Sequence, residues 1–346
     1  MQYKVLEKDK ISGFLDYLAS KHNLMAPVSE DESFSQFKRV YQASEINLNY
    51  TNTVIPPKNY FFPPAENLFS FSAENGGIEI KESRQAENMV IFGLRPCDIN
   101  GMSMLDPVFN GNFPDSYYGP KRERTILIGL SCQEVMPTCF CKSFGTDPTD
   151  GSGADLMLTG LENCFLVEIL TDKGAGLLEN AGGFFSDESV DKAISEKKLL
   201  RDKLAGAFLR EPDLSGVKEI LDKNFEHPYW EELAAKCIGC GICTFVCPTC
   251  HCFNMIDTSR PDATGSRYRC HDSCMFPGFT KMAGGHNPRP TRVERVRNRF
   301  MHKLKYHLDR YNLDGCSGCG RCIAKCPVNI DISQIITHIR EVVKDD

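Results

Sequence analysis

The sequence predicts an α/β domain on the N-terminal side, followed by a helical domain built around two cysteine-rich runs. Apolar stretches of buried-strand length at residues 89–94 (MVIFGL) and 125–130 (TILIGL), together with helical spacing of apolar residues near the N-terminus, predict the first domain. A cysteine pattern that occurs twice, at 237–248 and 316–327, with helical patterns around it, predicts the second. We expect a mixed α/β domain over 1–185, a helical linker over 186–224 and a helical domain over 225–346.

Composition narrows the class of protein. The 346 residues are 41% hydrophobic and 25% charged, which is typical of globular proteins and excludes a wholly disordered chain. No apolar run is long enough to span a membrane, and the N-terminal MQYKVLEKDK lacks the apolar region of a secretory signal. The net charge of −6 gives no general basis for nucleic-acid binding. Because 17 cysteines without an export signal are more typical of metal ligands or redox groups than of disulfides, we expect a cytoplasmic metalloprotein.

The elements of the N-terminal domain follow from local patterns. Ile11, Phe14, Leu15 and Leu18 recur at helical spacing and predict the first helix. The stretch that begins at Cys164 (CFLVEIL) predicts a strand, with Cys164 as a core residue. The proline-rich stretches 56–64 and 107–120 are expected to be loops.

Four cysteines follow the two predicted strands: Cys97, Cys132, Cys139 and Cys141. If the strands are parallel neighbours, both end at the same carboxyl edge, where α/β folds build their sites. Four converging thiols are enough for a third [4Fe–4S] cluster or for a zinc ion. The alternative is a set of small buried hydrophobic residues, although a Cys-Phe-Cys pair in a loop argues against it.

The linker and the approach to the first cysteine run are predicted to be helical. Ser186 is a candidate helix cap, and apolar residues recur after it at Ile194, Leu200, Leu204 and Phe208. Pro228 then begins a helix that leads to Cys237.

The repeated cysteine run is the most specific signal. CIGCGICTFVCP (237–248) and CSGCGRCIAKCP (316–327) both read C-x2-C-x2-C-x3-C-P, the bacterial ferredoxin pattern for [4Fe–4S] clusters. Three cysteines of a run wrap one cluster, and a helical turn that proline ends carries the fourth cysteine to the neighbouring cluster. The predicted ligand sets therefore cross: Cys237, Cys240, Cys243 and Cys326 for one cluster, and Cys316, Cys319, Cys322 and Cys247 for the other. Zinc sites or buried free thiols are the alternatives, but zinc usually uses paired C-x2-C hooks.

A basic helix is predicted between the two runs, over residues 292–311. Its candidate partner-docking residues are Arg292, Arg295, Arg299 and Lys303. Such a face is either solvated, or it raises the potentials of anionic clusters nearby and attracts an acidic partner. After the second run, Asp331 is a candidate cap for a last helix that begins at Ile332.

A further group of cysteines lies in the same insertion: Cys250, Cys252, Cys270 and Cys274. Their number is sufficient for a metal site, but their spacing matches no known motif. The alternative is that these thiols pack around the clusters and donate hydrogen bonds to cluster sulfur.

The motifs of nucleotide and hydrolase sites are missing. There is no G-x-G-x-x-G after a predicted strand, no Walker A sequence and no G-x-S-x-G elbow. Redox centres without a visible substrate site favour an electron conduit over a complete enzyme. Two hypotheses stay open beside it: a stand-alone redox enzyme with its reaction centre at the N-terminal cysteines, and an N-terminal docking scaffold.

The sequence also resembles a known family. Helices flanking both runs resemble the α-helical ferredoxin fold. The segments FGLRPCDINGMSMLD, CFCKSFGTDP and SCMFPGFTKMAGGHNPRPTRVERVRNRFMHK look like the iron–sulfur β subunit of cytoplasmic sulfhydrogenases. They are similar as well to one of the subunits of anaerobic sulfite reductase and to related subunits of flavin-linked heterodisulfide reductase complexes. The stretch VIPPKNYFFPPAENLFSF is closer to the hydrogenase and heterodisulfide reductase branch.

The resemblance implies a subunit that carries electrons within an anaerobic, multi-subunit oxidoreductase. One implied partner is a flavoprotein subunit that binds FAD and NAD(P). The other is a terminal hydrogenase, heterodisulfide reductase or sulfite reductase subunit. The eight ferredoxin cysteines carry over by position, as do the four N-terminal ones, while nucleic acid and membrane are not implied partners.

Overall fold

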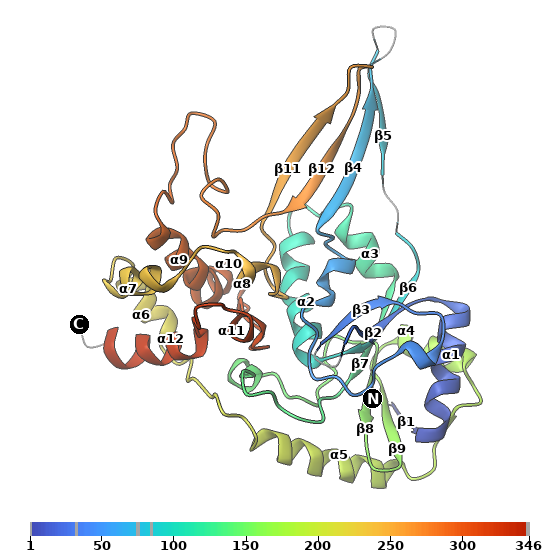
Figure 1. Ribbon diagram of the computed structural model, residues 1–346. Helices are drawn as coiled ribbons and strands as arrows, with labels where there is room; N and C mark the ends of the chain where they lie inside the picture. Colours follow the sequence, from blue (N-terminus) through green and yellow to red (C-terminus); the bar gives the residue numbers. More distant parts are fainter. Residues whose placement is uncertain (1, 32–33, 74–76, 84–85, 344–346) are drawn as a thin grey trace.

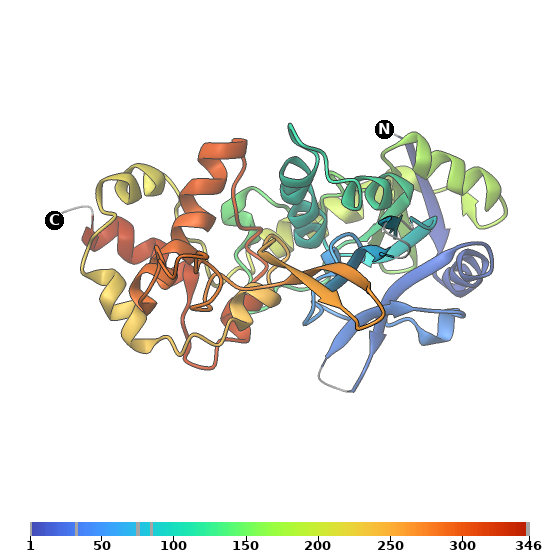
Figure 2. The ribbon, with the colours of Figure 1, turned by 90° about the horizontal axis from the view of Figure 1, so that it is seen from above.

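The structure is a computed structural model that describes residues 2–31, 34–73, 77–83 and 86–343. A sheet-rich N-terminal region and a group of helices near the C-terminus lie side by side, and a narrow sheet projects from the body (Figures 1 and 2). The predicted order of a sheet-containing part and a helical part is therefore confirmed. The outermost residues of the predicted ranges, 1 and 344–346, lie outside the described residues.

The N-terminal region is built on a mixed sheet of eight strands. In spatial order they are β10 (Phe185–Ser186), β1 (Gln2–Glu7), β9 (Cys164–Ile169), β8 (Leu156–Gly160), β7 (Thr125–Leu130), β6 (Met89–Leu94), β2 (Asn23–Ser29) and β3 (Ser35–Arg39). The predicted strands 89–94, 125–130 and the one from Cys164 are β6, β7 and β9. Strands β6 and β7 pair in parallel, with Met89 opposite Thr125, so both end at the same edge of the sheet.

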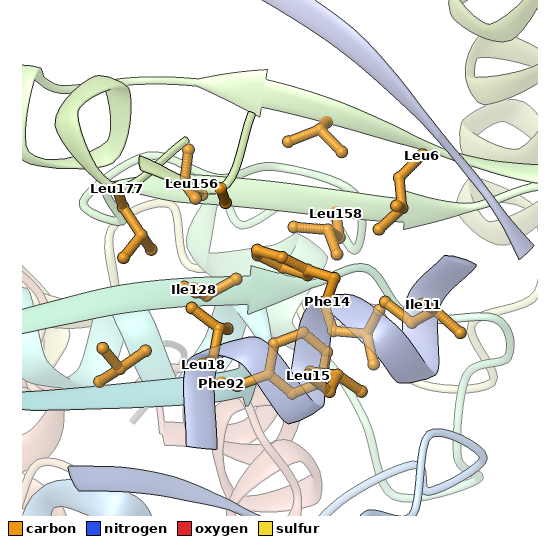
Figure 3. Packing of buried hydrophobic residues seen from close by; sticks show 14 of the residues in the cluster. Leu6, Ile11, Phe14, Leu15, Leu18, Phe92, Ile128, Leu156, Leu158 and Leu177 are labelled. Carbon is orange, nitrogen blue, oxygen red and sulfur yellow. The ribbon is translucent and has the colours of Figure 1, made fainter. Parts of the chain in front are cut away.

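Both faces of the central strands are covered, which explains their unbroken apolar sequences. On one face, α1 (Ile11–Lys21) and α4 (Asp172–Asn180) pack on the sheet, and Figure 3 shows Phe14 and Leu18 against Phe92 and Ile128. On the other face lie α2 (Pro96–Phe109) and α3 (Tyr118–Arg124), against alternate strand residues such as Ile91. The predicted first helix is confirmed as α1.

Two local predictions in this region are wrong. The predicted loop 107–120 is shorter, because α2 continues through Pro107 to Phe109 and α3 begins at Tyr118. Ser186 does not cap a helix, since it pairs with Val5 in the sheet. The linker helix α5 (Val190–Ala205) follows Ser189 instead, and α6 (Val217–Lys223) completes the linker. Short turns of 3-10 helix lie at Lys8–Lys10, Ala43–Glu45, Pro57–Tyr60 and Cys141–Phe144.

The C-terminal helices enclose both cysteine runs. They are α7 (Tyr229–Lys236), α8 (Ile242–Phe245), α9 (Arg292–Met301), α10 (His307–Tyr311), α11 (Arg321–Ala324) and α12 (Ile332–His338), with π-helical turns at His302–Tyr306 and Ile339–Val343. Apolar side chains of α7, α9 and α12, among them Trp230, Phe300 and Ile336, form one core. The predicted Asp331 cap is confirmed, because its carboxylate accepts the Ser333 N–H at 2.8 Å. No helix among the described residues is both long and apolar enough to cross a membrane.

The projecting sheet joins distant parts of the chain. The hairpin of β11 (Phe253–Ser259) and β12 (Thr264–His271) lies in the insertion between the runs, and β12 pairs with β4 (Ala65–Ser72) of the N-terminal region. Strand β5 (Glu79–Glu82) forms the far edge, beside β4 (Figure 1). The insertion therefore ties the two regions together through backbone pairing.

Candidate metal centres

The two cysteine runs have the same local backbone. Gly239 and Gly318, at equivalent positions, have φ of +72° and +62°, and Gly241 and Gly320 have φ of +75° and +73°. These left-handed conformations suit glycine and let the loop turn tightly around its own cysteines. A short helix, α8 or α11, begins directly after the second glycine and carries the fourth cysteine away from the loop.

One pocket is lined by cysteines of both runs. Cys237, Cys240 and Cys243 of the first run lie around it with Cys326, the last cysteine of the second run. The rest of the lining is mainly apolar, with Val296, Phe300 and Ile332 among its residues, and Cys322 also reaches it. The structure thus brings together the four residues that the crossed scheme assigns to one cluster.

The other crossed set is also brought together. Burial raises the pKa of the Cys322 thiol, and the neighbouring Cys316, Cys247 and Cys319 thiols raise it further, while Arg299 lowers it. Burial likewise raises the pKa of Cys316 to about 12, with Cys247 the next cause. These through-space effects agree with a shared buried site for the four thiols.

Backbone N–H groups point at several of these sulfur atoms. Gly239 donates to Cys237 Sγ at 3.4 Å, Gly318 donates to Cys316 Sγ at 3.4 Å, and Ile330 donates to Cys326 Sγ at 3.2 Å. Such donors stabilise anionic sulfur, which is the form that binds iron. These donors favour a thiolate-bound group at these positions, and they partly oppose the effect of burial, which raises the pKa of Cys237 and Cys316.

The four N-terminal cysteines also converge. Cys97 lies in the first turn of α2, directly after β6, whereas the other three follow β7. Cys97, Cys141 and Cys319 share one buried cluster, and Cys139 packs against it. Burial raises the pKa of Cys139 to about 12, and Cys132 and Cys319 contribute among its neighbours. The N-terminal group therefore lies next to the second ferredoxin run.

Close backbone contact holds these two groups together. The Phe140 N–H donates to the Gly318 carbonyl at 2.9 Å. A Cβ atom at Gly318 would lie 2.5 Å from Cys141 Cα, and one at Gly320 would lie 2.3 Å from the Thr138 carbonyl oxygen. Glycine is needed here for close approach as well as for φ.

A buried ion pair spans the same junction. Arg321 Nη1 lies 2.7 Å from Asp98 Oδ1, and the two side chains are 3% and 0% exposed. Arg321 also donates to the Thr53 carbonyl at 2.6 Å. A buried pair of this kind aligns the start of α2 with the start of α11 and is costly to break from one side.

Three of the four insertion cysteines lie near the second ferredoxin set. The Cys250 thiol lowers the pKa of Cys247, and the Cys274 thiol lowers the pKa of Cys252, so each pair lies close together. Cys270 lies instead within β12, opposite Asn254 of β11 and Ala65 of β4. Among the residues that the structure describes, no group of three or more His, Cys, Asp or Glu side chains is arranged to hold a single metal ion. The cysteines of a [4Fe–4S] cluster each bind a different iron corner, so they need not converge on one point as the ligands of a single ion do.

Comparisons with known proteins identify the family. The 4Fe-4S dicluster domain family matches residues 236–330, a range that contains both cysteine runs. Over 343 residues the chain is 35% identical to sulfhydrogenase 2 subunit beta of Pyrococcus furiosus, covering 99% of each protein.

The chain belongs to the sulfhydrogenase β-subunit family. The predicted resemblance is confirmed, and with the dicluster domain it makes this chain an iron–sulfur protein of electron transport. The Pyrococcus furiosus relative is named as one subunit of a sulfhydrogenase. No solved structure matches the chain.

In this member of the sulfhydrogenase β-subunit family, the predicted docking face is mostly turned inward. Arg292 is exposed, but Arg295, Arg299 and Lys303 are 8%, 4% and 1% exposed. The expectation that these three side chains meet a partner is wrong, because a partner surface reaches only accessible charge. Arg299 donates instead to the Cys243 carbonyl at 2.7 Å and to Cys250 Sγ at 3.1 Å. The other expectation, of positive charge close to the cluster cysteines, agrees with these contacts.

Sequence reasoning missed three buried charged residues of this site, Lys58 and the Asp98–Arg321 pair. Lys58 is 2% exposed and donates to the Cys250 carbonyl, although its proline-rich surroundings carry no local signal for a site. The Asp98–Arg321 pair had a partial signal, since both residues directly neighbour predicted cysteine ligands. Cys164, predicted as core, begins β9 and packs partly buried against a small apolar cluster.

Proposed function

We propose that this chain is the electron-transfer iron–sulfur subunit of a multi-subunit oxidoreductase. The observation that carries the proposal is that Cys326 lies with Cys237, Cys240 and Cys243 around one pocket, across the two runs. Clusters of the [4Fe–4S] type bound by the two crossed sets would each carry one electron at a time. The helices that enclose both runs support an α-helical ferredoxin domain.

The position of the N-terminal cysteines supports a third [4Fe–4S] cluster on Cys97, Cys132, Cys139 and Cys141. Cys141 and Cys319 pack in the same buried cluster, so this group would adjoin the second ferredoxin centre. Cys322 lines the pocket of the first centre while it neighbours the ligands of the second. The resulting order is N-terminal centre, second-run centre, first-run centre, and the burial of Cys97 and Cys141 favours a relay over a substrate site.

The ends of this order suggest where partners act. Cys240 and Ile238 are exposed at the first-run pocket, so an electron partner has access there. We propose that one partner is a flavoprotein subunit with FAD and NAD(P). The other is a hydrogenase, heterodisulfide reductase or sulfite reductase subunit, within a cytoplasmic complex. Support for subunit partners comes from the relative, which is named as a β subunit.

Iron analysis with matched variants tests the proposal. Two cubes give ~8 iron atoms per chain and three give ~12. Because the ligand sets cross, Cys326→Ala should change the same paramagnetic centre as Cys237→Ala, and Cys164→Ala should change none. If Cys326→Ala instead reproduced the spectrum of Cys316→Ala, the crossed arrangement would be refuted. A protein purified anaerobically without iron would refute the electron-transfer role itself.

The N-terminal centre has a separate test. Cys139→Ala should lower the iron content by about four atoms relative to Cys164→Ala. Unchanged iron would leave the N-terminal region without a centre, while the two ferredoxin centres would stand.

A further inference from the structure

The first-run pocket carries apolar side chains that are open to solvent. Ile238 is 58% exposed and Ile242 is 36% exposed, and the exposed Cys240, a predicted cluster ligand, lies between them in the sequence. All three residues line the pocket that brings the two cysteine runs together. Exposed apolar side chains that have polar residues around them are typical of a surface that contacts another protein.

Exposed cations adjoin the same pocket. Lys236 directly precedes Cys237, and Lys325 directly precedes Cys326, and both cysteines are predicted ligands of the first-run centre. Arg292 donates a hydrogen bond to the Cys237 carbonyl at 2.6 Å. All three basic side chains are exposed. Positive charge that a partner can reach therefore lies beside two of the four predicted ligands.

The loop that leads into α9 adds a fourth exposed cation. The loop begins against the first run, because Met275 lines the pocket and a Cβ atom at Gly241 would lie 2.8 Å from the Phe276 ring. It ends at Arg292, which contacts the same run. Between these two points the loop projects from the helical part of the protein (Figure 1), and Lys281 is exposed on it.

Acidic residues are missing from the segments that carry these cations. The chain has 46 Asp and Glu residues in total, yet none of them occurs in 236–248, 275–292 or 316–330. In the part of the chain that the structure describes, none of the four cations forms an ion pair with a carboxylate. The charge beside the pocket is therefore positive although the net charge of the chain is −6.

We propose that this surface docks a one-electron redox protein whose own surface is acidic around its redox group. We call it the basic rim, defined as Lys236, Lys281, Arg292 and Lys325 around Ile238 and Ile242. Carboxylates of the partner would meet the four cations, and one electron would pass between the partner's redox group and the first-run centre. Such complementary charge accelerates the encounter and orients it. The proposal rests on the proposed function, because it requires a redox centre in the pocket.

Electron transfer to two protein probes of opposite charge tests the proposal. The full-length, anaerobically purified protein is reduced with dithionite and mixed in a stopped-flow instrument with plastocyanin of the acidic type or with cytochrome c, which is basic. Both probes accept one electron. We expect the second-order rate constant with plastocyanin to fall as the ionic strength rises from ~10 mM to ~1 M, because the Debye length shortens from ~30 Å to ~3 Å. The rate constant with cytochrome c should not fall.

Charge-reversal variants locate the docking surface. At low ionic strength, Lys325→Glu and Lys281→Glu should each lower the rate constant with plastocyanin roughly 3–10-fold relative to Lys198→Glu, which is part of the 10–10³-fold that electrostatic steering provides. Lys198 is exposed on α5, beside the eight-stranded sheet (Figure 1), so this control makes the same change in net charge away from the basic rim. At ~1 M salt the three variants should react at the same rate.

The outcomes separate the basic rim from the relay. If the rate constant with plastocyanin rises with salt, or if Lys325→Glu and Lys281→Glu react as fast as Lys198→Glu, the basic rim is refuted while the reducible clusters and the relay stand. Lys281 does not adjoin a predicted ligand, so Lys281→Glu decides the question if Lys325→Glu loses iron. Protein without iron would refute the relay and, with it, the docking surface that serves it.

Discussion

Replacing Gly318 by alanine tests whether the second ferredoxin run must touch the N-terminal cysteine loop. The new Cβ would lie 2.5 Å from Cys141 Cα and 2.6 Å from the Phe140 carbonyl oxygen. Both are backbone atoms, so a side-chain rotation cannot relieve the contact. The two segments must separate, and the Phe140 N–H to Gly318 hydrogen bond of 2.9 Å must lengthen or break.

The magnitude follows from two contributions. A residue with a Cβ at a φ of +62° has left-handed strain of roughly 1–2 kcal/mol. Overpacking against backbone adds about 1–3 kcal/mol. Gly239→Ala is the matched control, because Gly239 has the same place in the first run and a φ of +72°, but its nearest heavy atom is 4.0 Å away. The difference between the two variants is therefore the collision alone, about 1–3 kcal/mol.

Anaerobic thermal unfolding at one scan rate measures this difference. At ~2–4 °C per kcal/mol, the value for domains of 150–250 residues, Gly318→Ala should melt several degrees below Gly239→Ala. Magnetic coupling between the N-terminal and second-run centres should also weaken in Gly318→Ala. Equal melting temperatures and equal coupling in the two variants would refute the close contact as a structural requirement.

Three further predictions concern the buried charges and the metal. Arg321→Met should lower the free energy of unfolding by about 3–5 kcal/mol, because it leaves the Asp98 carboxylate buried without its partner. In thermal unfolding, the double variant with Asp98→Asn should recover part of that loss. Equal stability of the single and double variants would contradict this. Burial and then the Lys303 charge lower the pKa of His302 to about 2, so below about pH 6.5 the unfolded chain binds a proton that the folded protein does not. The free energy of unfolding should therefore decrease as the pH falls below about 6.5, by at most ~1.4 kcal/mol per pH unit. His302→Asn should reduce the slope of this decrease between pH 7 and 5. Identical slopes in wild type and variant would show that the His302 ring is accessible to protons. Removal of iron by oxygen or a chelator should reduce helical circular dichroism along with visible absorbance, since cluster binding is coupled to folding, and bleaching without loss of helix would separate the two.

The parts that sequence reasoning predicted correctly are local. Strands β6 and β7 are apolar over six residues each, because both faces of the sheet are buried, and this leaves a signal in consecutive residues. The spacing within each cysteine run reflects a loop and a short helix only a few residues long. The N-cap at Asp331 depends on contacts within three residues.

The errors have a physical reason as well. The spacing of apolar and basic residues in α9 predicted an apolar face and a basic face, and both exist. This spacing does not indicate which segments each face contacts in the folded protein. Arg299 and Lys303 are buried against the first run and the loop after it, where the Cys243 carbonyl, the Thr249 hydroxyl and the Cys250 sulfur accept their hydrogen bonds. Likewise, β12 and β4 pair although about 200 residues separate them, and the sequence of neither strand indicates its pairing partner.

By itself, the sequence determined which cysteines belong to each ferredoxin run, which strands bring the N-terminal cysteines to one edge, and the family. Only the tertiary structure decided that Cys141 shares a buried cluster with Cys319, and that Lys58, Arg299 and Lys303 are buried against residues Thr249 and Cys250. Helices, strands and cysteine loops can be predicted from neighbouring residues, because the backbone geometry of these elements repeats every two to four positions. Contacts between distant segments depend on how whole elements pack, and in this chain those contacts place the candidate redox groups beside one another.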